Sequence, residues 1–85
     1  MPDELRSPIK HHLVLHWRNP ERGVGQFYSL MIERDLFGGV VLVRNWGRIG
    51  THGREMVEEF AGEIEAGRAL ETIAQAKRTR GYRDL

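Results

Sequence analysis

The sequence predicts a small α+β domain, in which an antiparallel sheet of about four strands is covered by one C-terminal amphipathic helix. Short apolar segments rich in β-branched and aromatic residues follow one another between residues 11 and 60, separated by turns containing Gly, Pro or Asn. From residue 63 onward the apolar residues recur at spacings of three and four. Consecutive strands with short connections pair as a meander, and the helix can bury its apolar stripe only against the sheet.

Four segments are expected to form the strands, and turn-forming residues bound them. They cover residues 11–17, 25–34, 40–46 and 54–60. In the second segment, Tyr28, Leu30 and Ile32 fall on one side of an extended chain, and this side is expected to face the core. Gly38 and Gly39 predict a tight turn before the third segment, because glycine accepts the positive φ values of short hairpins.

The helix is expected from Glu63 to about Arg80. Its predicted stripe consists of Ile64, Ala66, Ala69, Leu70, Ile73, Ala74 and Lys77. Glutamates crowd the first half and basic residues the last turn, a distribution that favours the helix dipole. Gly81 stands where a C-capping glycine is expected.

The length of 85 residues suffices for one domain, which we expect to span residues 11–85 behind a flexible lead-in at residues 1–10. Hydrophobic residues make up 40% and charged residues 29% of the chain, as in globular proteins. The chain has no cysteine, which excludes disulfide bonds and thiolate zinc sites and fits a cytoplasmic protein. No apolar run approaches the roughly 20 residues of a membrane-spanning helix.

The net charge of +1 results from blocks of opposite sign. Residues 36–54 contain three arginines and no acidic residue, whereas residues 55–71 contain six glutamates and one arginine. Residues 77–83 hold four basic residues and no acidic residue. If the fold joins the two basic blocks, a cationic patch suited to a polyanion results. If the glutamates pair with the arginines, the same residues form an ordinary solvated surface.

The segment that bears on function begins with Trp46-Gly47-Arg48 at the end of the third predicted strand. If the chain stays extended, Arg48 lies on the same side as Trp46, and an indole beside a guanidinium can hold a nucleotide by stacking and ion pairing. Two structural alternatives stay open. Trp46 can instead be a core residue, and Arg48 can pair with Glu55 or Glu58 inside the fold.

This pattern resembles the WGR domain, which is named after its Trp-Gly-Arg signature. The resemblance covers the chain from about His11 to Tyr82. It rests on the apolar strand before Trp46, the run Trp46-Gly47-Arg48-Ile49-Gly50-Thr51-x-Gly53, the adjacent aromatics Phe27-Tyr28, Phe60 with Glu65-Ala66 before the helix, and Lys77 with Gly81-Tyr82 at its end. The resemblance implies the same small sheet with one packed helix.

In DNA-damage-responsive poly(ADP-ribose) polymerases this family helps to bind broken DNA. Its tryptophan packs against the sugar near a strand end, its arginine lies at the same interface, and a basic residue of the helix corresponds to Lys77. The resemblance therefore implies that Trp46 and Arg48 contact nucleic acid, with Lys77 as a second-rank contact. Similar modules occur in bacterial proteins, and the zinc fingers and catalytic domain of the polymerases have no counterpart in these 85 residues.

We predict a nucleic-acid-binding module that prefers duplex DNA, at ends or nicks, without reading base sequence. The predicted contact residues are Trp46, Gly47, Arg48, Arg44, Arg54, Lys77, Arg78 and Arg80. The alternative is a module that binds a protein partner or a second copy of itself through the same Trp46 and Arg48 surface. The two are distinguished by nucleic-acid binding at low salt.

Catalytic and metal sites are not expected. His12 and His16 can share a strand face, but their Cβ atoms would lie about 13 Å apart at the rise of a strand, too far for one ion. Ser7 and Ser29 have no Ser-His-Asp setting, and the glycine-rich loop lacks the Gly-Lys-Ser/Thr of a phosphate-binding loop. We therefore predict no enzymatic activity, no cofactor, no small-molecule substrate and no membrane partner.

Overall fold

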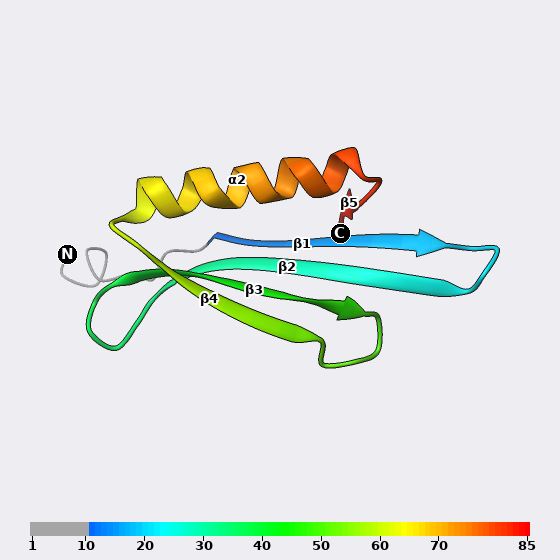
Figure 1. Cartoon of the computed structure of the whole chain (residues 1–85), viewed down its shortest axis with the longest axis horizontal. Coiled ribbons are helices and arrows are strands. Elements are labelled where there is room, and N and C mark those ends of the chain that lie inside the picture. The colour runs from blue at the N-terminus through cyan, green and yellow to red at the C-terminus, as the bar shows by residue number, and fades with distance from the viewer. Residues whose placement is uncertain (1–10) are drawn as a thin grey trace.

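The computed structural model describes residues 11–85, which form a five-stranded antiparallel sheet with one helix packed on it (Figure 1). The elements are β1 (His11–Asn19), β2 (Val24–Arg34), β3 (Val40–Arg48), β4 (Arg54–Phe60), helix α2 (Glu63–Thr79) and β5 (Arg83–Asp84). The strand order is β4-β3-β2-β1-β5. The predicted α+β meander is confirmed, and the C-terminal residues add a short fifth strand beside β1. The lead-in expected at residues 1–10 lies outside the described residues.

The antiparallel register aligns side chains in rows across the sheet. One row consists of Leu15, Tyr28, Trp46 and Arg54, and the next consists of Trp17, Gln26 and Arg48. The first row points to the side that carries α2, because Leu15 and Tyr28 belong to the core cluster that includes helix residues. The second row points to the same side, since its members are two residues away along each strand.

Helix α2 packs on this face and forms the core with it. Ala66, Leu70 and Ala74 are buried with the apolar residues of the sheet, as the stripe predicted. The inclusion of Ile64 in that stripe is wrong, because its side chain is 69% exposed. Ile64 precedes Ala66 by two residues, which places it about 200° around the helix from the buried row.

The C-terminus of α2 closes with the capping arrangement that the sequence predicts. Gly81 takes a φ of +107°, which favours glycine. Its N–H donates to the carbonyl of Arg78, and the N–H of Tyr82 donates to the carbonyl of Lys77, the pair of bonds of a Schellman motif. The motif reverses the chain and brings Tyr82 back beside Lys77, where β5 then begins.

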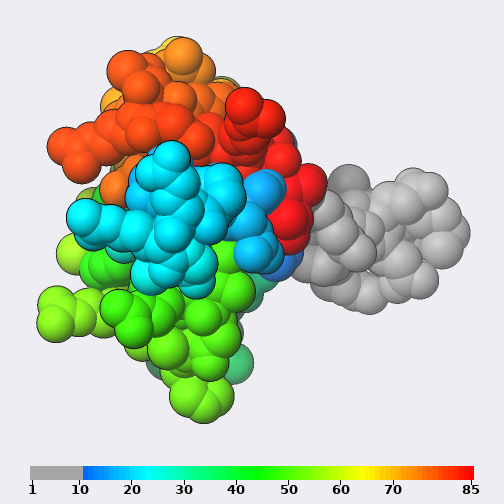
Figure 2. Space-filling view, turned by 90° about the vertical axis from the view of Figure 1, so that its right-hand side faces the viewer, coloured from blue at the N-terminus to red at the C-terminus, as the bar shows by residue number. Residues whose placement is uncertain are grey.

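The long axis of the molecule separates two ends (Figure 1). At one end, which we call the aromatic end, lie the β1–β2 loop, the β3–β4 loop and the C-terminus of α2; Figure 2 looks onto it. At the other, the hairpin end, lie the β2–β3 turn and the N-terminus of α2. The two basic blocks of the sequence contribute to the aromatic end, and much of the acidic block lies toward the hairpin end.

Candidate nucleic-acid interface

Trp46 lies on the helix-facing side of β3 with arginines on three sides. Strand β3 continues through Arg48, two residues beyond its predicted end, so Arg48 projects to the same side as Trp46. Arg54 is the partner of Trp46 across the β3–β4 ladder. Arg44 precedes Trp46 by two residues on the same face. The register therefore places three arginine residues next to Trp46 on one face of the sheet.

The fourth side of Trp46 is occupied by Tyr28. The two rings stack with centroids 5.6 Å apart and an interplanar angle of 15°. Trp46 is half-buried and packs against the core cluster, whereas Tyr28 belongs to the cluster itself. Trp46 is therefore partly a core residue and partly available to a ligand, because one part of its ring packs against the core and another part is accessible.

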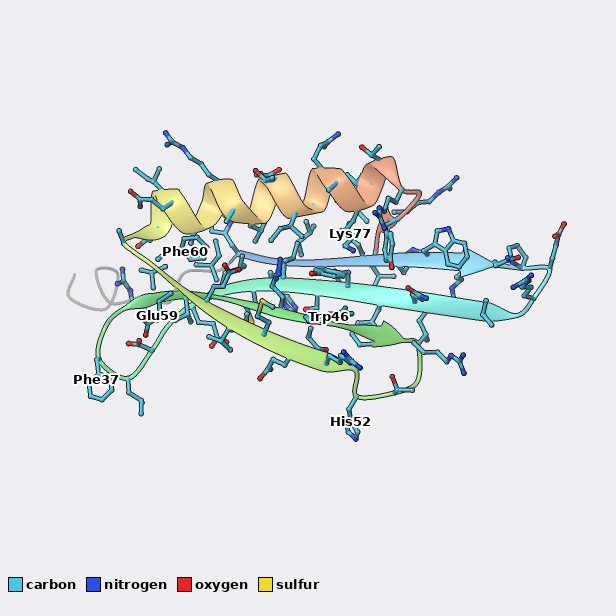
Figure 3. The ribbon with its side chains drawn as sticks, in the orientation of Figure 1. Phe37, Trp46, His52, Glu59, Phe60 and Lys77 are labelled. Atoms are coloured by element: carbon cyan, nitrogen blue, oxygen red, sulfur yellow. The ribbon has the colours of Figure 1, made fainter. Side chains whose placement is uncertain are left out.

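Lys77 brings the helix into this site. Figure 3 shows its side chain extending from α2 toward the sheet, above the region of Trp46. Its Nζ lies 4.5 Å from the ring centroid of Tyr28 and 5.6 Å from that of Tyr82, within the range of cation–π attraction. The C-terminal part of the helix therefore contacts Tyr28, the stacking partner of Trp46, and the two basic blocks share one surface.

The environment of this cluster shifts two pKa values. The pKa of Lys77 is lowered, first because burial removes water from the ammonium group and then because Arg80 and Arg44 repel its charge. The pKa of Tyr28 is raised, chiefly by burial and against the opposing attraction of Arg44. The accumulated positive charge favours an anion, which would relieve the repulsion on Lys77.

The guanidinium group of Arg44 contacts two side chains of β4. Its Nε lies 4.0 Å from a carboxylate oxygen of Glu58, and its Nη2 donates to the sulfur of Met56 at 3.2 Å. Within residues 11–85, Glu58 forms an ion pair with Arg44 and not with Arg48. The expected alternative pairing of Arg48 inside the fold is therefore not found in this part of the chain, where Arg48 is exposed.

The backbone of Gly47 lies close to the backbone of Gly53. A Cβ at Gly47 would lie 2.8 Å from the Cα of Gly53, and a Cβ at Gly53 would lie 2.3 Å from the carbonyl oxygen of Trp46. The two backbones are thus in contact at the base of the β3–β4 loop. Asn45 fastens the same loop, because its Nδ2 donates to the carbonyls of His52 and Arg54. The structure places Gly47 against the loop and on the opposite face from Trp46.

Arg78 is turned away from the Trp46 surface. Its Nε and Nη2 donate to the two carboxylate oxygens of Asp84 in β5, at 2.8 and 2.9 Å. This bidentate bond raises the pKa of Arg78 and lowers that of Asp84. Arg78 also lines a hollow with His11, His12 and Leu70 on the β1 side of the helix, so it is not brought together with Trp46.

Tyr82 and the predicted contact residue Arg80 lie close to each other at the aromatic end. The Tyr82 hydroxyl donates to Oε1 of Gln26 at 2.9 Å. Arg80 lines a hollow with Trp17, Gln26 and Tyr82, beside Lys77. Gln26, Tyr28 and Tyr82 thus join the site. Tyr28 and Gln26 belong to the site because the β2–β3 register pairs them with Trp46 and Arg48. The sequence could have indicated this pairing only through the position of the β2–β3 turn, which sets the register.

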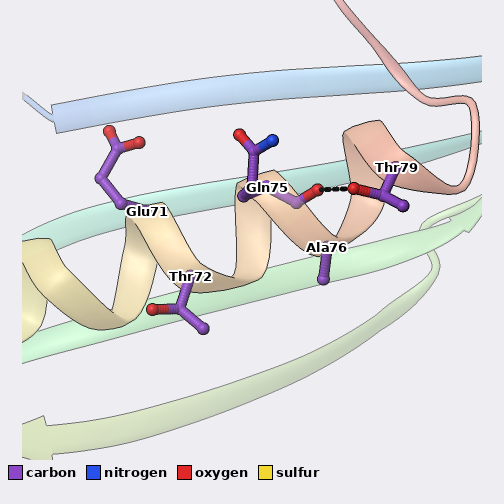
Figure 4. A pocket seen from close by; sticks show the side chains of 5 residues that line it. All are labelled: Glu71, Thr72, Gln75, Ala76 and Thr79. Carbon is purple, nitrogen blue, oxygen red and sulfur yellow. Dashed lines mark hydrogen bonds between the residues drawn. The ribbon is translucent and has the colours of Figure 1, made fainter.

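The hollow on the outer side of α2 offers no comparable chemistry. A shallow depression on the outer side of α2 is lined by Glu71, Thr72, Gln75, Ala76 and Thr79 (Figure 4). It carries one carboxylate and no aromatic ring. Among the described residues 11–85, no group of three or more potential ligand side chains could hold a metal ion. No helix in this range is long and apolar enough to cross a bilayer.

Comparison with known proteins identifies the family. The WGR domain family matches residues 11–85. An uncharacterized protein of Sinorhizobium fredii is 41% identical over 80 residues, which cover 94% of this chain and 39% of that protein. A crystal structure of a Bacteroides fragilis protein has the same fold, with a TM-score of 0.72 and 23% identity over 88% of this chain and 19% of that one. The chain thus spans well under half the length of either protein.

Proposed function

We propose that this chain, which belongs to the WGR domain family, binds nucleic acid through the cationic aromatic surface around Trp46. The observation that carries the proposal is the stack of Trp46 on Tyr28 with Lys77 above it and arginines on the remaining sides. Aromatic rings support sugars and bases, and the surrounding cations neutralise phosphates.

The proposed contacts differ in what they supply. Trp46 provides the packing surface, and Arg48, Arg54, Lys77 and Arg80 provide phosphate contacts at the aromatic end. Arg44 and Gly47 shape the surface from within the fold, through Met56 and the β3–β4 loop. Arg78 contributes charge from the β1 side, where Asp84 holds it.

The proposed ligand is duplex DNA, with a preference for ends or nicks. A partly accessible indole can pack on a terminal sugar, which a continuous duplex does not present. Base-sequence reading is not proposed, because the exposed face of α2, which carries Arg68 and Gln75, also carries Glu71 and lies away from the Trp46 surface. We propose a binding role without catalysis, inside the cell where DNA is present.

The test compares blunt, nicked and circular duplexes by fluorescence anisotropy at 50 and 200 mM salt. Trp46→Ala and Arg48→Ala are each expected to weaken binding about tenfold, from lost stacking and a lost charge-assisted contact. Arg68→Ala is the matched control, since Arg68 is exposed in the middle of α2 and away from the aromatic end. Affinity should fall steeply at the higher salt.

Absence of binding to every duplex at low salt would overturn the proposal. Binding that ignores both substitutions would remove Trp46 from the site. Light scattering on the same samples tests the alternative, a protein-interaction module, because self-association that Trp46→Ala abolishes would assign this surface to a second copy of the chain.

A further inference from the structure

Trp17 is the second tryptophan of the chain, and its position differs from what its strand predicts. It lies on the same side of β1 as Leu13 and Leu15, a pattern that predicts a core or second-layer residue. Leu15 is fully buried, but Trp17 is half-buried and is not among the residues that form the core cluster or pack against it. It lies at the aromatic end, where the chain turns at Gly81 beyond the last residue of α2.

The ring of Trp17 is held in place from one side. A Cβ at Gly81 would lie 3.3 Å from Cδ1 and 3.4 Å from Nε1 of the indole, so the backbone of the helix cap rests on that edge. The remaining surface of the ring borders two hollows. The ring is therefore positioned by the fold while part of it faces open space, the condition for a stacking platform.

The two hollows have a common chemistry. One, of about 280 Å³, is lined by Trp17, Gln26, Arg80 and Tyr82. The other, of about 340 Å³, is lined by His16, Trp17, Arg18, Pro20, Gly81 and Arg83. Neither has an acidic residue in its lining, and together their linings include three arginines, of which Arg80 lies with Trp17, Gln26 and Tyr82.

The first hollow also offers directed hydrogen bonds. The hydroxyl of Tyr82 donates to Oε1 of Gln26, which leaves the amide N–H groups of Gln26 free to donate. Flat rings, an amide donor and arginines are the groups that hold unstacked bases in single-strand sites. The hollow thus fits a nucleobase with its phosphate better than it fits an apolar ligand.

The position of Trp17 relative to the Trp46 surface is fixed by the register. Trp17 pairs with Gln26, and Gln26 pairs with Arg48, so Trp17 and Arg48 lie in one row two strands apart. At the usual spacings of strands and residues, the Cα atoms of Trp17 and Trp46 are about 12 Å apart. A strand that ends its duplex at Trp46 can therefore reach Trp17 with its next unpaired nucleotides.

We infer that Trp17 is a second platform, on which an unpaired nucleotide beside a duplex end stacks its base. The inference rests on the proposed function, since it needs the duplex at Trp46. It specifies the ligand further, as a duplex with a short single-stranded extension that is recognised by stacking on Trp17 and by a phosphate contact from Arg80.

The test measures anisotropy of blunt duplexes and of duplexes with two-nucleotide 5′ or 3′ extensions. The parent should bind one of the extended duplexes about tenfold more tightly than the blunt duplex, the scale of one stacked base. Trp17→Ala should remove that advantage and leave affinity for the blunt duplex within about twofold, and Trp17→Phe should retain part of it. Phe37→Ala, which removes a 95% exposed ring at the hairpin end, is the matched control and should change neither affinity.

The two tryptophans give a second readout, because each can be made the sole fluorophore. In Trp46→Phe, emission from Trp17 should respond to an extended duplex and not to a blunt one, at DNA concentrations that anisotropy shows to be saturating. In Trp17→Phe, emission from Trp46 should respond to both.

The outcomes separate the two proposals. Equal affinity of the parent for blunt and extended duplexes, or an extension advantage that survives Trp17→Ala, would overturn the role of Trp17 and leave the Trp46 site intact. Failure of the parent to bind any duplex would overturn both. If Trp17 has a purely structural role, Trp17→Ala should lower the melting temperature and weaken binding to blunt and extended duplexes by the same factor. That result would also overturn the inference.

Discussion

The two ends of the molecule are built from the same sheet and helix but expose opposite chemistries. At the aromatic end, Trp46 is half-buried on Tyr28 with cations around it. At the hairpin end, Leu36 and Phe37 are 97% and 95% exposed, and glutamates lie nearby on β4 and α2. The ring of Trp46 is thus supported by the core, whereas the ring of Phe37 is almost fully exposed.

The hairpin end is held by polar contacts of the Asp35 and Arg34 side chains. Asp35 Oδ1 accepts hydrogen bonds from the N–H groups of Phe37 and Gly39, at 2.9 and 2.8 Å. Arg34 joins the turn to the helix through Glu63 at 2.8 Å. A rigid turn therefore coexists with exposed side chains, which shows that order alone does not mark a binding site. What distinguishes the aromatic end is order combined with basic residues gathered around Trp46.

The largest expected effect comes from reversing charge at one end and then at the other. Arg48→Glu with Arg54→Glu should weaken DNA binding about a hundredfold and reduce the salt slope by about 2, because two phosphate contacts are lost and repulsion replaces them. Glu59→Arg with Glu65→Arg changes the net charge by the same amount in the opposite direction. It should change affinity by no more than about threefold, since these residues lie toward the hairpin end.

Both double variants are to be compared by anisotropy in 50 and 200 mM salt. If the two double variants change DNA affinity by equal factors in opposite directions, binding follows the net charge of the protein. The two ends would then not differ in their contribution to DNA binding. Circular dichroism verifies that each variant keeps its fold.

The sequence predicted the architecture because each element carries its own local signal. The β-branched run before Trp46 predicts a strand, and the three- and four-residue spacing of Ala66, Leu70 and Ala74 predicts the helix and its buried side. Ile64 was misassigned because it is apolar and near the stripe, although the helix turn places it elsewhere. Strand β5 was not predicted because two residues are too few to show a periodic pattern. Its pairing with β1 also depends on the Schellman turn that precedes it.

The site was predicted in part, and the limit was the register. Trp46, Arg48 and Lys77 carry the family signature and can be found from sequence. The contact of Tyr28 with Trp46, and the row that joins Trp17 to Arg48, depend on which residues of adjacent strands lie opposite each other. A shift of one residue would send these side chains to the other face, so strand assignment alone cannot place them.

A smaller effect is expected at the hairpin end, where Asp35→Ala should lower the free energy of unfolding by about 1 kcal/mol, because two turn amides lose their shared acceptor. Urea denaturation followed by circular dichroism measures this loss. Leu36→Ala is the control and should leave stability unchanged, since its side chain is 97% exposed. DNA affinity should be the same in both variants, and a loss of affinity in Asp35→Ala would show that the two ends are coupled.

The smallest expected effect is a pH dependence at the aromatic end. The pKa of Lys77 is lowered by burial and by Arg80 and Arg44, so its ammonium group loses its proton at a lower pH than an ordinary lysine. Binding should therefore weaken about threefold as the pH rises from 7 toward 10, when one phosphate contact is lost. The neighbouring Tyr28 stays neutral over more of this range because its own pKa is raised, and Tyr82→Phe removes the other phenol as a cause. Lys77→Arg should abolish the dependence, since a guanidinium group stays charged. A dependence that persists in Lys77→Arg and disappears in Tyr82→Phe would transfer the effect from the ammonium group to the tyrosine beside it.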